Sequence, residues 1–389
     1  MKSLTKINFT DIKTVGLRVD FNVPIDDNFL ITDATRLLRA LETIEFVKKK
    51  DCKILLISHF GRPKERFDEK FSFHYLIDQF SKYLGLKLNL ITYENFMNKG
   101  LQDFRDSSQK LFLLENIRFF SGEKNNNKDF SKAITDHLDL YINEAFSASH
   151  RSHASVDQMP KNIVSAPGLN FEKELLAIKE IKNSSKKKLA IIGGSKVSTK
   201  INTLLSLTKS CSNIFIGGAM ANNFLKFQGI PVSSSLLEEN SEKMISQIYT
   251  LSKKTECEIH LPLDVVLDNE QPITIDRLSS VEKFKILDLS DESMKLLNTL
   301  ISRSETILWN GPMGMIEEPY FAKGSIKLAN LLAETPNEVV IGGGDTLLAI
   351  KLANVSFQKY NFVSTAGGAF LEALEDNDLP GVKALNQDQ

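Results

Sequence analysis

Short runs of consecutive apolar residues recur along the chain, separated by stretches in which apolar residues return every three or four positions. The first part contains the runs TVGLRVDF, KILLIS, LKLNLI, KLFLLEN and DLYINEAF, and the second part contains KKLAIIGG, SNIFIGG, ECEIHLPLDVVL, ETILWNG, NEVVIGGG and NFVSTAGG. The runs of the second part are apolar throughout, which is typical of parallel strands buried on both faces. Because helical patterns such as ATRLLRALETIEFVKKK lie between them, the alternation predicts an α/β fold with two parallel-sheet domains.

A helical segment separates the two halves of this pattern. FEKELLAIKEIKN follows the turn-like SAPGLN and places four apolar residues on one helical face: Phe171, Leu175, Ile178 and Ile181. We interpret this segment as an interdomain helix. The predicted organisation is an N-terminal domain over residues 1–168, the helix over 169–185, a C-terminal domain over 186–370 and a tail over 371–389 that lies outside the second sheet.

The composition of the chain is that of an ordinary globular protein. Of its 389 residues, 42% are hydrophobic and 25% are charged, and the net charge of -1 gives no electrostatic reason to bind nucleic acid or an anionic membrane. No apolar run approaches the roughly 18 residues that span a bilayer, and the opening MKSLTKINFTDIK lacks the apolar core of a signal peptide. Cys52, Cys211 and Cys257 are too few and too widely spaced for a disulfide framework or a zinc site. We therefore expect a cytoplasmic protein without nucleic-acid or membrane partners.

Arginine is unevenly distributed along the chain. The 48 basic residues include ten arginines, and eight of these ten lie at or before Arg151. The planar fork of arginine suits bidentate binding of phosphate and carboxylate groups. On count alone, chance in a lysine-rich composition explains the bias equally well, but the bias indicates where to look for an anionic ligand.

The predicted strands of the second part end in glycine-rich loops. These loops are GGSK (193–196), GGAM (217–220), NGPMG (310–314), GGGDT (342–346) and TAGG (365–368). Ligands of parallel sheets bind beyond the carboxyl ends of the strands, where glycine lets backbone N–H groups approach a phosphate. One such loop is more often structural, but five after successive strands indicate a phosphate-bearing ligand. The sequence has no P-loop, no G-x-G-x-x-G, no G-x-S-x-G and no H-E-x-x-H.

Charged residues accompany two of these loops. Lys196 and Lys200 lie four positions apart, and we expect them to share a face at the start of a helix, toward the phosphate side of the sheet. Asp345 follows three glycines, where a lone carboxylate suits Mg²⁺ held together with phosphate oxygens. An N-cap on the following helix is an equally good interpretation of Asp345.

The strand ends of the first part carry anion-binding side chains in place of glycine cradles. Asp20 and Asn22 stand in RVDFNVP, His59 and Arg62 in SHFGRP, Arg118 in ENIRFF, and His150 and Arg151 in SASHRSHAS, while Arg36 lies early in the helix after the first strand. A turn needs neither the histidine nor the arginine of SHFGRP. We therefore expect His59 and Arg62 to bind a small phosphorylated or carboxylated molecule, the alternative being a turn with a solvated arginine.

Eight motifs together resemble those of the phosphoglycerate kinases. RVDFNVP, SHFGRP, ENIRFF, NEAFSASHRSHAS, GGSKVSTK, WNGPMG, GGGDT and STAGGAFLE appear in the order of that family and cover essentially the whole chain. The resemblance implies two Rossmann-like domains joined by a helix, with the tail returning to the first domain. It also implies reversible phosphoryl transfer between ATP and the carboxylate of 3-phosphoglycerate, giving 1,3-bisphosphoglycerate and ADP in glycolysis and gluconeogenesis, by a monomer that uses Mg²⁺.

The resemblance assigns roles to the residues at matching positions. The phosphoglycerate would be bound by Asp20, Phe21, Asn22, Arg36, His59, Phe60, Gly61, Arg62, Arg118 and Arg151, and the nucleotide by Lys200, Asn310, Glu317, Gly342, Gly343, Gly344, Asp345 and Thr346. Asp345 would hold Mg²⁺, while Arg36, Lys196 and Lys200 would balance charge on the transferring phosphoryl group. Three positions depart from the family pattern: Glu144 stands in place of an aspartate, and Ala219 and Ala366 stand in place of loop glycines.

Two domains with complementary sites imply in-line transfer when the domains close around both substrates. The acceptor carboxylate is ionised at neutral pH, so no general base is expected. Two other classes of protein are alternatives to this interpretation. A two-domain nicotinamide-dependent dehydrogenase would need the glycine spacing and the following acidic residue that are missing here. A hinge-type binding protein for a small anion would have no use for five glycine loops.

Overall fold

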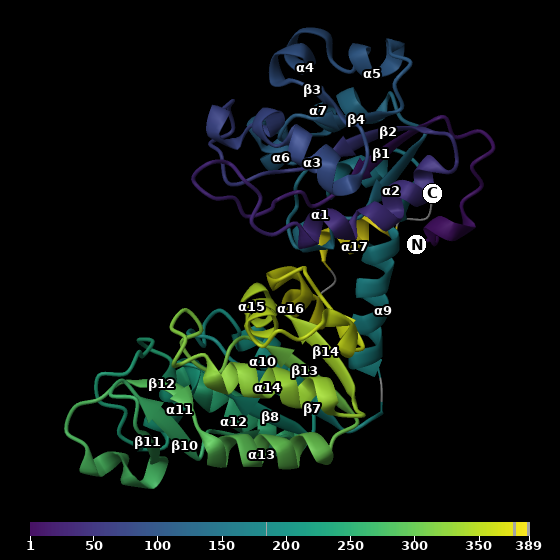
Figure 1. Ribbon diagram of the computed structural model, residues 1–389. Coiled ribbons are helices and arrows are strands. Elements are labelled where there is room, and N and C mark those ends of the chain that lie inside the picture. Colours follow the sequence, from purple (N-terminus) through teal and green to yellow (C-terminus); the bar gives the residue numbers. More distant parts are fainter. Residues whose placement is uncertain (184, 376–378, 387–389) are drawn as a thin grey trace. The chain divides into compact units, whose positions relative to one another are not determined.

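The computed structural model describes residues 1–183, 185–375 and 379–386, which form two compact units (Figure 1). Unit 1 comprises Met1–Leu176 and Asp378–Gln389, and unit 2 comprises Ala177–Asn377. The division falls inside helix α9 (Leu169–Asn183), so each unit contains one part of this helix.

Unit 1 is built on a six-stranded parallel sheet. Its strands run in the order β3 (Asn89–Ile91), β4 (Leu111–Leu114), β2 (Lys53–Ile57), β1 (Thr14–Arg18), β5 (Leu140–Asn143) and β6 (Ser165–Pro167). Side chains of β2 alternate between two hydrophobic clusters, because Ile54 and Leu56 pack into one cluster while Leu55 and Ile57 pack into the other. Both faces of the sheet are therefore buried, as is usual for a parallel sheet.

The central strands of unit 1 end level with one another. Arg18, the last residue of β1, pairs with Ile57 at the end of β2 and with Asn143 at the end of β5. The residues that follow these three strands therefore emerge side by side at the carboxyl edge of the sheet.

The helices of unit 1 differ from the sequence prediction in one place. They are α1 (Thr35–Arg39), α2 (Leu41–Lys48), α3 (Ile77–Leu84), α4 (Tyr93–Lys99), α5 (Gln102–Asp106), α6 (Ser121–Lys124), α7 (Lys128–Thr135), α8 (Gln158–Asn162) and α17 (Pro380–Leu385), with 3-10 turns at Leu4–Lys6, Glu69–Phe71, Phe73–Tyr75, Ile117–Phe119 and Phe146–Ala148. The single helix expected from ATRLLRALETIEFVKKK is two helices. The chain tightens at Ala40, whose N–H donates to the Leu37 carbonyl, and the Arg39 carbonyl accepts a hydrogen bond from the Asn170 side chain.

Unit 2 contains a second six-stranded parallel sheet. Its order is β15 (Phe362–Val363), β14 (Glu338–Gly342), β13 (Thr306–Asn310), β7 (Lys188–Ile192), β8 (Asn213–Ile216) and β9 (Glu258–His260). The helices of this unit are α10 (Ile201–Ser210), α11 (Met220–Phe227), α12 (Glu242–Thr255), α13 (Asp291–Ser302), α14 (Lys323–Glu334), α15 (Gly344–Leu352) and α16 (Gly368–Leu374), with 3-10 turns at Ile275–Ser280 and Phe357–Lys359. Helices α13, α14 and α15 pack on one face of the sheet around Trp309, and Figure 1 shows α13 and α14 side by side.

A small antiparallel sheet in unit 2 is absent from the sequence prediction. It has the order β11 (Pro272–Thr274), β10 (Asp264–Leu267) and β12 (Ile286–Leu289). The run ECEIHLPLDVVL, expected to be one strand, is divided between β9 of the parallel sheet and β10 of this one. Pro262 lies at the break, where its missing N–H cannot continue a ladder of hydrogen bonds.

The residues expected to form a tail are divided between the units. Helix α16 lies in unit 2, where the Ser206 hydroxyl donates to the Leu374 carbonyl at 2.7 Å. Helix α17 lies in unit 1, where the Gly381 N–H donates to the Ser149 carbonyl at 2.9 Å. The two parallel sheets confirm the predicted fold class. Among the described residues, no helix combines the length and the apolar character needed to cross a membrane.

Candidate functional site

The loops that follow β1 and β2 in unit 1 are joined by polar side chains. The Asn22 side-chain oxygen accepts from the Gly61 N–H at 2.9 Å, and the Asp20 carboxylate accepts from the Asn22 N–H at 3.2 Å. The Ser147 hydroxyl, from the loop after β5, also donates to Asp20. Three strand ends are thus held together by residues that the motifs had singled out.

Arg36 reaches this group of loops from helix α1. Its Nη1 atom lies 3.6 Å from the Asp20 Oδ2 atom and donates to the Asn22 carbonyl at 3.3 Å. The side chain of Arg36 remains about one-third exposed. The guanidinium is therefore oriented by the protein and still accessible to a ligand.

Several arginine side chains lie close together beneath these loops, and their positive charges repel one another. Arg118 is buried and donates from Nη1 to the Gly61 carbonyl at 2.6 Å. Burial, Arg151 and Arg18 together lower its pKa to about 10. Mutual repulsion of this kind is relieved when an anion binds.

Three histidines lie within the field of these arginines. Burial and then Arg18 lower the pKa of His59 well below its ordinary value, and burial and then Arg151 lower that of His150. Burial and Arg118 lower the pKa of His153 to about 4. These side chains are therefore neutral near pH 7, so the arginines supply the positive charge.

Some residues assigned to this site do not present their side chains to a ligand. The Phe21 side chain is fully buried in the core with its ring 5.2 Å from that of Phe80, and Phe60 packs against Phe71 and Phe73. Only the backbone of Phe21 and Phe60 can face a ligand. Arg62 by contrast is exposed.

Arg18 belongs to this region and was missed in the sequence analysis. It is the last residue of β1, it is 1% exposed, and it pairs with His59. The motif RVDFNVP contains it, but a charged residue ending a buried strand looks like a surface residue until the fold is known.

The five glycine loops of unit 2 lie together at the carboxyl edge of its sheet, after the five neighbouring strands β15, β14, β13, β7 and β8. Each loop contains one glycine with a positive φ, a backbone conformation that favours glycine: Gly194, Gly218, Gly311, Gly343 and Gly367. Several of these loops also touch through their backbones. A Cβ atom on Gly311 would lie 2.5 Å from the Gly193 carbonyl oxygen. Much of the glycine content is therefore structural.

Two glycines of these loops are required neither by backbone conformation nor by packing. A Cβ atom on Gly344 or on Gly368 would meet no protein atom within 4 Å, and neither residue has a positive φ. Both begin helices, since Gly344 is the first residue of α15 and Gly368 the first of α16. Open space in front of a helix N-terminus is suited to the close approach of a phosphate.

Lys200, Asn310 and Thr346 tie the glycine loops to one another. The Lys200 ammonium donates to the Gly193 carbonyl and to the Asn310 Oδ1 atom, each at 2.6 Å, and burial lowers its pKa to about 8. The Asn310 amide donates to the Gly342 carbonyl at 2.6 Å. The Thr346 hydroxyl accepts from the Gly311 N–H at 2.7 Å and donates to the Gly342 carbonyl at 2.8 Å. Asn310 and Thr346 are both buried, so they shape the loops from within.

The expected common helical face of Lys196 and Lys200 is wrong. Helix α10 begins at Ile201 with Lys200 as its N-cap residue, and Lys196 is an exposed loop residue. The helix cannot start earlier because the Ser198 N–H and hydroxyl both donate to the Glu238 carboxylate, which holds the segment as a loop.

The structure tests the N-cap interpretation of Asp345. The N-cap of α15 is Gly343, and Asp345 is the exposed second residue of the helix. The N-cap interpretation of Asp345 is therefore wrong. The carboxylate lies near enough to Lys200 to raise the pKa of that ammonium, against the larger effect of burial.

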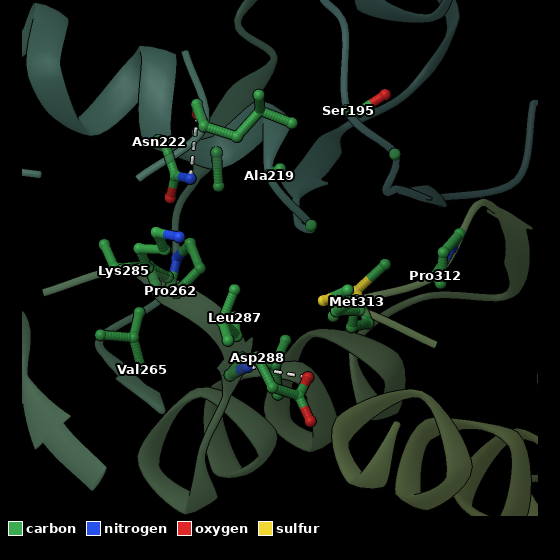
Figure 2. A pocket seen from close by; sticks show the side chains of 18 of the residues that line it. Ser195, Ala219, Asn222, Pro262, Val265, Lys285, Leu287, Asp288, Pro312 and Met313 are labelled. Atoms are coloured by element: carbon green, nitrogen blue, oxygen red, sulfur yellow. Dashed lines mark hydrogen bonds between the residues drawn. The ribbon is translucent and has the colours of Figure 1, made fainter. Parts of the chain in front are cut away.

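A cavity of about 450 Å³ opens beside these loops (Figure 2). Its wall includes Gly194, Gly218, Glu317 and Asp345 together with apolar side chains of Leu236, Val265, Leu287, Pro312, Met313 and Met315. Figure 2 shows Leu287 and Met313 on opposite sides of the hollow, with Ala219 above and Asp288 below. An apolar cavity with polar groups at one end has the character of a site for a small organic ligand.

The apolar wall of this cavity was not found from the sequence. Val265 comes from β10 and Leu287 from β12, both in the antiparallel sheet that the sequence analysis missed. No short motif marks these residues, since each looks like an ordinary core position. Glu317 and Asp345, which were assigned to the nucleotide, both line the cavity.

The described residues contain no group of three or more His, Cys, Asp or Glu side chains that could hold a metal ion by themselves. A metal at this site would need most of its ligands from a bound molecule or water. Asp345, as a single exposed carboxylate at the cavity, fits a Mg²⁺ ion that arrives with phosphate oxygens.

The structure accommodates the three departures from the family pattern. Ala219 is the N-cap residue of α11 and lines the cavity, and Ala366 is buried with its N–H bonded to the Ser364 hydroxyl. Glu144 is buried and accepts hydrogen bonds from the backbone N–H groups of Asn170 and Phe171 in α9. Desolvation by burial raises the pKa of Glu144 to about 7.

Two parallel-sheet units, one rich in buried arginine and one edged with glycine loops beside an apolar cavity, define an α/β protein built to hold phosphate-bearing ligands. The family model for phosphoglycerate kinase matches residues 4–377. The chain is 37% identical over 386 residues to the phosphoglycerate kinase of Wolbachia sp. subsp. Drosophila simulans (strain wRi), covering 96% of each chain. It is 38% identical over 397 residues to that of Prochlorococcus marinus (strain MIT 9312), covering 99% of this chain and 98% of the other.

Solved structures give the same result. Phosphoglycerate kinase from Coxiella burnetii superposes with a TM-score of 0.86 at 32% identity, covering 99% of this chain and 98% of the other. The enzyme from Pyrococcus horikoshii OT3 shares the fold, with a TM-score of 0.84 at 24% identity over 99% and 98% of the two chains. The chain belongs to the phosphoglycerate kinase family. It is a kinase that transfers a phosphoryl group between ATP and 3-phosphoglycerate in glycolysis and gluconeogenesis, and the dehydrogenase and binding-protein alternatives are excluded.

Proposed function

We propose that the two units divide the substrates of this reaction. The strand ends of unit 1 bind 3-phosphoglycerate or 1,3-bisphosphoglycerate, and the glycine loops and cavity of unit 2 bind ATP or ADP. The observation that carries the proposal is the separation of two kinds of anion site, clustered arginines in one unit and open helix N-termini in the other.

The acceptor site is built on oriented positive charge. Arg36, held beside Asp20, and Arg118, held at the Gly61 carbonyl, contribute guanidinium groups that need not reorganise when an anion binds. Arg62 is exposed, and it closes on the ligand from the loop after β2. Arg151 adds charge from the loop after β5, and His59 contributes a neutral imidazole. The remaining contacts come from Asp20, Asn22, Gly61 and the backbone of Phe21 and Phe60.

The nucleotide site combines the apolar cavity with the loop 342–346. The base occupies the cavity between Leu287 and Met313, where it is removed from water, and Glu317 accepts hydrogen bonds from the ribose. The phosphates lie against the N-terminus of α15 at Gly344, where no protein atom fills the space. Asp345 holds the Mg²⁺ ion, which supplies positive charge beside the phosphates when the nucleotide is bound.

Transfer itself requires positioning and charge in place of covalent chemistry. Because the two substrates bind to different units, the units must bring them into line and exclude water. Arg36 from unit 1 and Lys200 from unit 2 stabilise the charge on the moving phosphoryl group, and the exposed Lys196 approaches it from the loop after β7. The acceptor carboxylate is already ionised, so no side chain acts as a general base. We further propose that the enzyme acts as a cytoplasmic monomer without nucleic-acid or membrane partners.

Calorimetry on Arg62→Ala tests the division of substrates. Arg62 is exposed and therefore contributes little to folding. Loss of a charge-assisted hydrogen bond worth about 1.5–3 kcal/mol lowers the affinity for 3-phosphoglycerate roughly ten- to hundredfold, and the affinity for MgADP stays unchanged.

Arg66→Ala is the matched control, because Arg66 is an exposed arginine four positions further along the same loop. This control should leave both affinities unchanged. An equal loss of MgADP affinity in Arg62→Ala would contradict separate sites.

A further inference from the structure

Arg18 is fixed inside unit 1 by hydrogen bonds that use most of its donors. Its Nε atom donates to the Ser155 hydroxyl at 2.9 Å, and Nη1 donates to the Val19 carbonyl and, at 3.5 Å, to the Ile57 carbonyl. The side chain is 1% exposed. Arg18 therefore cannot act as one of the arginines that touch the substrate.

Ser155 links the guanidinium of Arg18 to the buried carboxylate of Glu123. The Ser155 hydroxyl accepts from Arg18 and donates to the Glu123 Oε1 atom at 2.6 Å, and the Ser155 N–H donates to Oε2 at 2.8 Å. Glu123 is fully buried. The three side chains form a buried hydrogen-bonded chain that fixes the orientation of the guanidinium.

The remaining contact of Arg18 determines the state of His59. The Arg18 Nη2 atom lies 3.0 Å from the His59 Nδ1 atom. Arginine has no acceptor and stays protonated, so this contact exists only if Nδ1 of His59 is the acceptor. A neutral imidazole that accepts at Nδ1 carries its proton on Nε2.

The other nitrogen of His59 is available to a ligand. Within the described residues, Nε2 makes no hydrogen bond, and it is not among the buried atoms without a partner, so it reaches the surface of the site. His59 follows β2 directly, in the loop that also contains Gly61 and Arg62.

We propose that Arg18 is a positioning residue that holds His59 as a neutral imidazole with its proton on Nε2, so that His59 donates a hydrogen bond to the acceptor substrate without carrying charge. This inference rests on the proposed assignment of His59 to the acceptor site. Protonation of Nδ1 would require the Arg18 contact to break. The other charged groups that face His59 are Arg36, Arg118 and Arg151, which oppose its protonation in the same sense.

The direct test is nitrogen-resolved NMR of the imidazole of His59 in the wild-type protein. The expected result is an Nδ1 atom that stays unprotonated and an Nε2 atom that stays protonated between about pH 5 and 8. A protonated Nδ1, or a full titration of His59 in this range, overturns the inference. This measurement needs no variant, so it decides the question even if a substituted protein fails to fold.

The double variant Arg18→Met, Glu123→Gln removes both buried charges together, so neither is left unpaired. In this variant His59 becomes free to titrate and to exchange tautomers. The measured quantity is the KM of the double variant for 3-phosphoglycerate divided by the KM of the control Glu123→Gln. Because a protonated His59 attracts the anionic substrate, this ratio falls as the pH drops, by up to about tenfold per pH unit. A ratio that is constant with pH contradicts the positioning role.

Addition of 3-phosphoglycerate to the wild-type protein separates this inference from the assignment on which it rests. A change in the Nε2 resonance alone supports both. If the resonances of His59 do not respond although the substrate binds, the assignment of His59 to the acceptor site is wrong, while the tautomer measured in the free protein still reports on Arg18.

Discussion

At the scale of single residues, exposure separates the polar side chains that hold the loops together from those that can contact a ligand. Asn310 and Thr346 are buried and bonded to neighbouring loops, whereas Asp345, adjacent to Thr346 in the sequence, is exposed at the cavity. Substitution of a buried residue therefore changes the loops as well as any ligand contact. Asp345 allows the two effects to be separated.

The variant Asp345→Asn should lose turnover and keep its stability. The carboxylate is not the N-cap of α15, so its removal should change the free energy of unfolding by less than about 1 kcal/mol, the usual effect of a charge near a helix N-terminus. If Asp345 holds Mg²⁺, kcat should fall at least roughly tenfold. Coupled assays and thermal unfolding measure the two quantities.

Asp291→Asn is a suitable control, because Asp291 is an exposed aspartate in the first turn of α13. It should lose no more than about 1 kcal/mol of stability, because Asp291 forms an exposed ion pair with Lys327, and it should be fully active. Equal losses of activity in both variants would show that the effect of Asp345 is not specific to the nucleotide.

At the scale of elements, the first residues of helices are where substitutions best test the proposed phosphate contacts. Gly344→Ala introduces a methyl group that meets no protein atom within 4 Å, at a helix position without positive φ. The substitution should leave the protein as stable or up to about 1 kcal/mol more stable, because alanine reduces the freedom of the unfolded chain. It should weaken MgADP binding if the phosphates approach this backbone closely.

Gly311→Ala provides the opposite case within the same group of loops. Its φ of 91° and the Gly193 carbonyl, 2.5 Å from the added Cβ atom, should destabilise the protein by about 1–3 kcal/mol. Calorimetry and chemical unfolding distinguish the variants. Undiminished MgADP affinity in Gly344→Ala would mean that the phosphates do not contact this turn.

The start of α9 should make stability depend on pH. Glu144 binds the first N–H groups of this helix, and burial raises its pKa from 4.5 to about 7. The folded protein then holds the proton of Glu144 more tightly than the unfolded chain does. The contribution of this group to stability is therefore complete below about pH 4.5 and is lost as the pH rises through about 7. Such a shift corresponds to at most about 3 kcal/mol.

Glu144→Gln removes this titration. The free energy of unfolding of the variant, relative to wild type, should therefore rise between about pH 5 and 8. Glu172→Gln, at a partly exposed position in the first turn of α9, is the control and should show no such rise. A difference between Glu144→Gln and wild type that does not vary with pH would refute the burial of an ionisable carboxyl group at this position.

At the scale of the whole molecule, the reaction needs both units, since each is proposed to bind one substrate. Arg36→Ala tests how unit 1 takes part. If Arg36 acts mainly in the transition state, kcat should fall roughly 10²-fold while the KM for 3-phosphoglycerate changes little. Solution scattering with both substrates should show the variant compacting like the wild-type protein, because the substrates still drive closure.

Arg105→Ala, an exposed arginine of α5, is the control for this experiment and should retain normal kinetics. A normal kcat with a raised KM would make Arg36 a simple substrate anchor. Failure of Arg36→Ala to compact would give it a role in closure instead.

The sequence by itself determined the fold class and the types of residue at the strand ends. Apolar runs and helical periodicity are local properties, because a strand buried on both faces needs apolar residues whatever lies beside it. For the same reason the five glycine loops and the motif arginines could be recognised before their positions were known. Their motifs identified the family without any contact being visible.

Only the tertiary structure decided which of these side chains are buried and which partners they bond. Arg18 and Arg118 both end or follow apolar runs, but their partners, Ser155 and Gly61, lie 137 and 57 positions away in the sequence. Part of the apolar wall of the cavity likewise comes from an antiparallel sheet whose short strands carry no distinctive pattern. Burial and hydrogen-bond partnership depend on segments that meet only in the folded chain, so no local pattern could reveal that Lys196 and Lys200 lie outside a helix or that Arg18 bonds to His59.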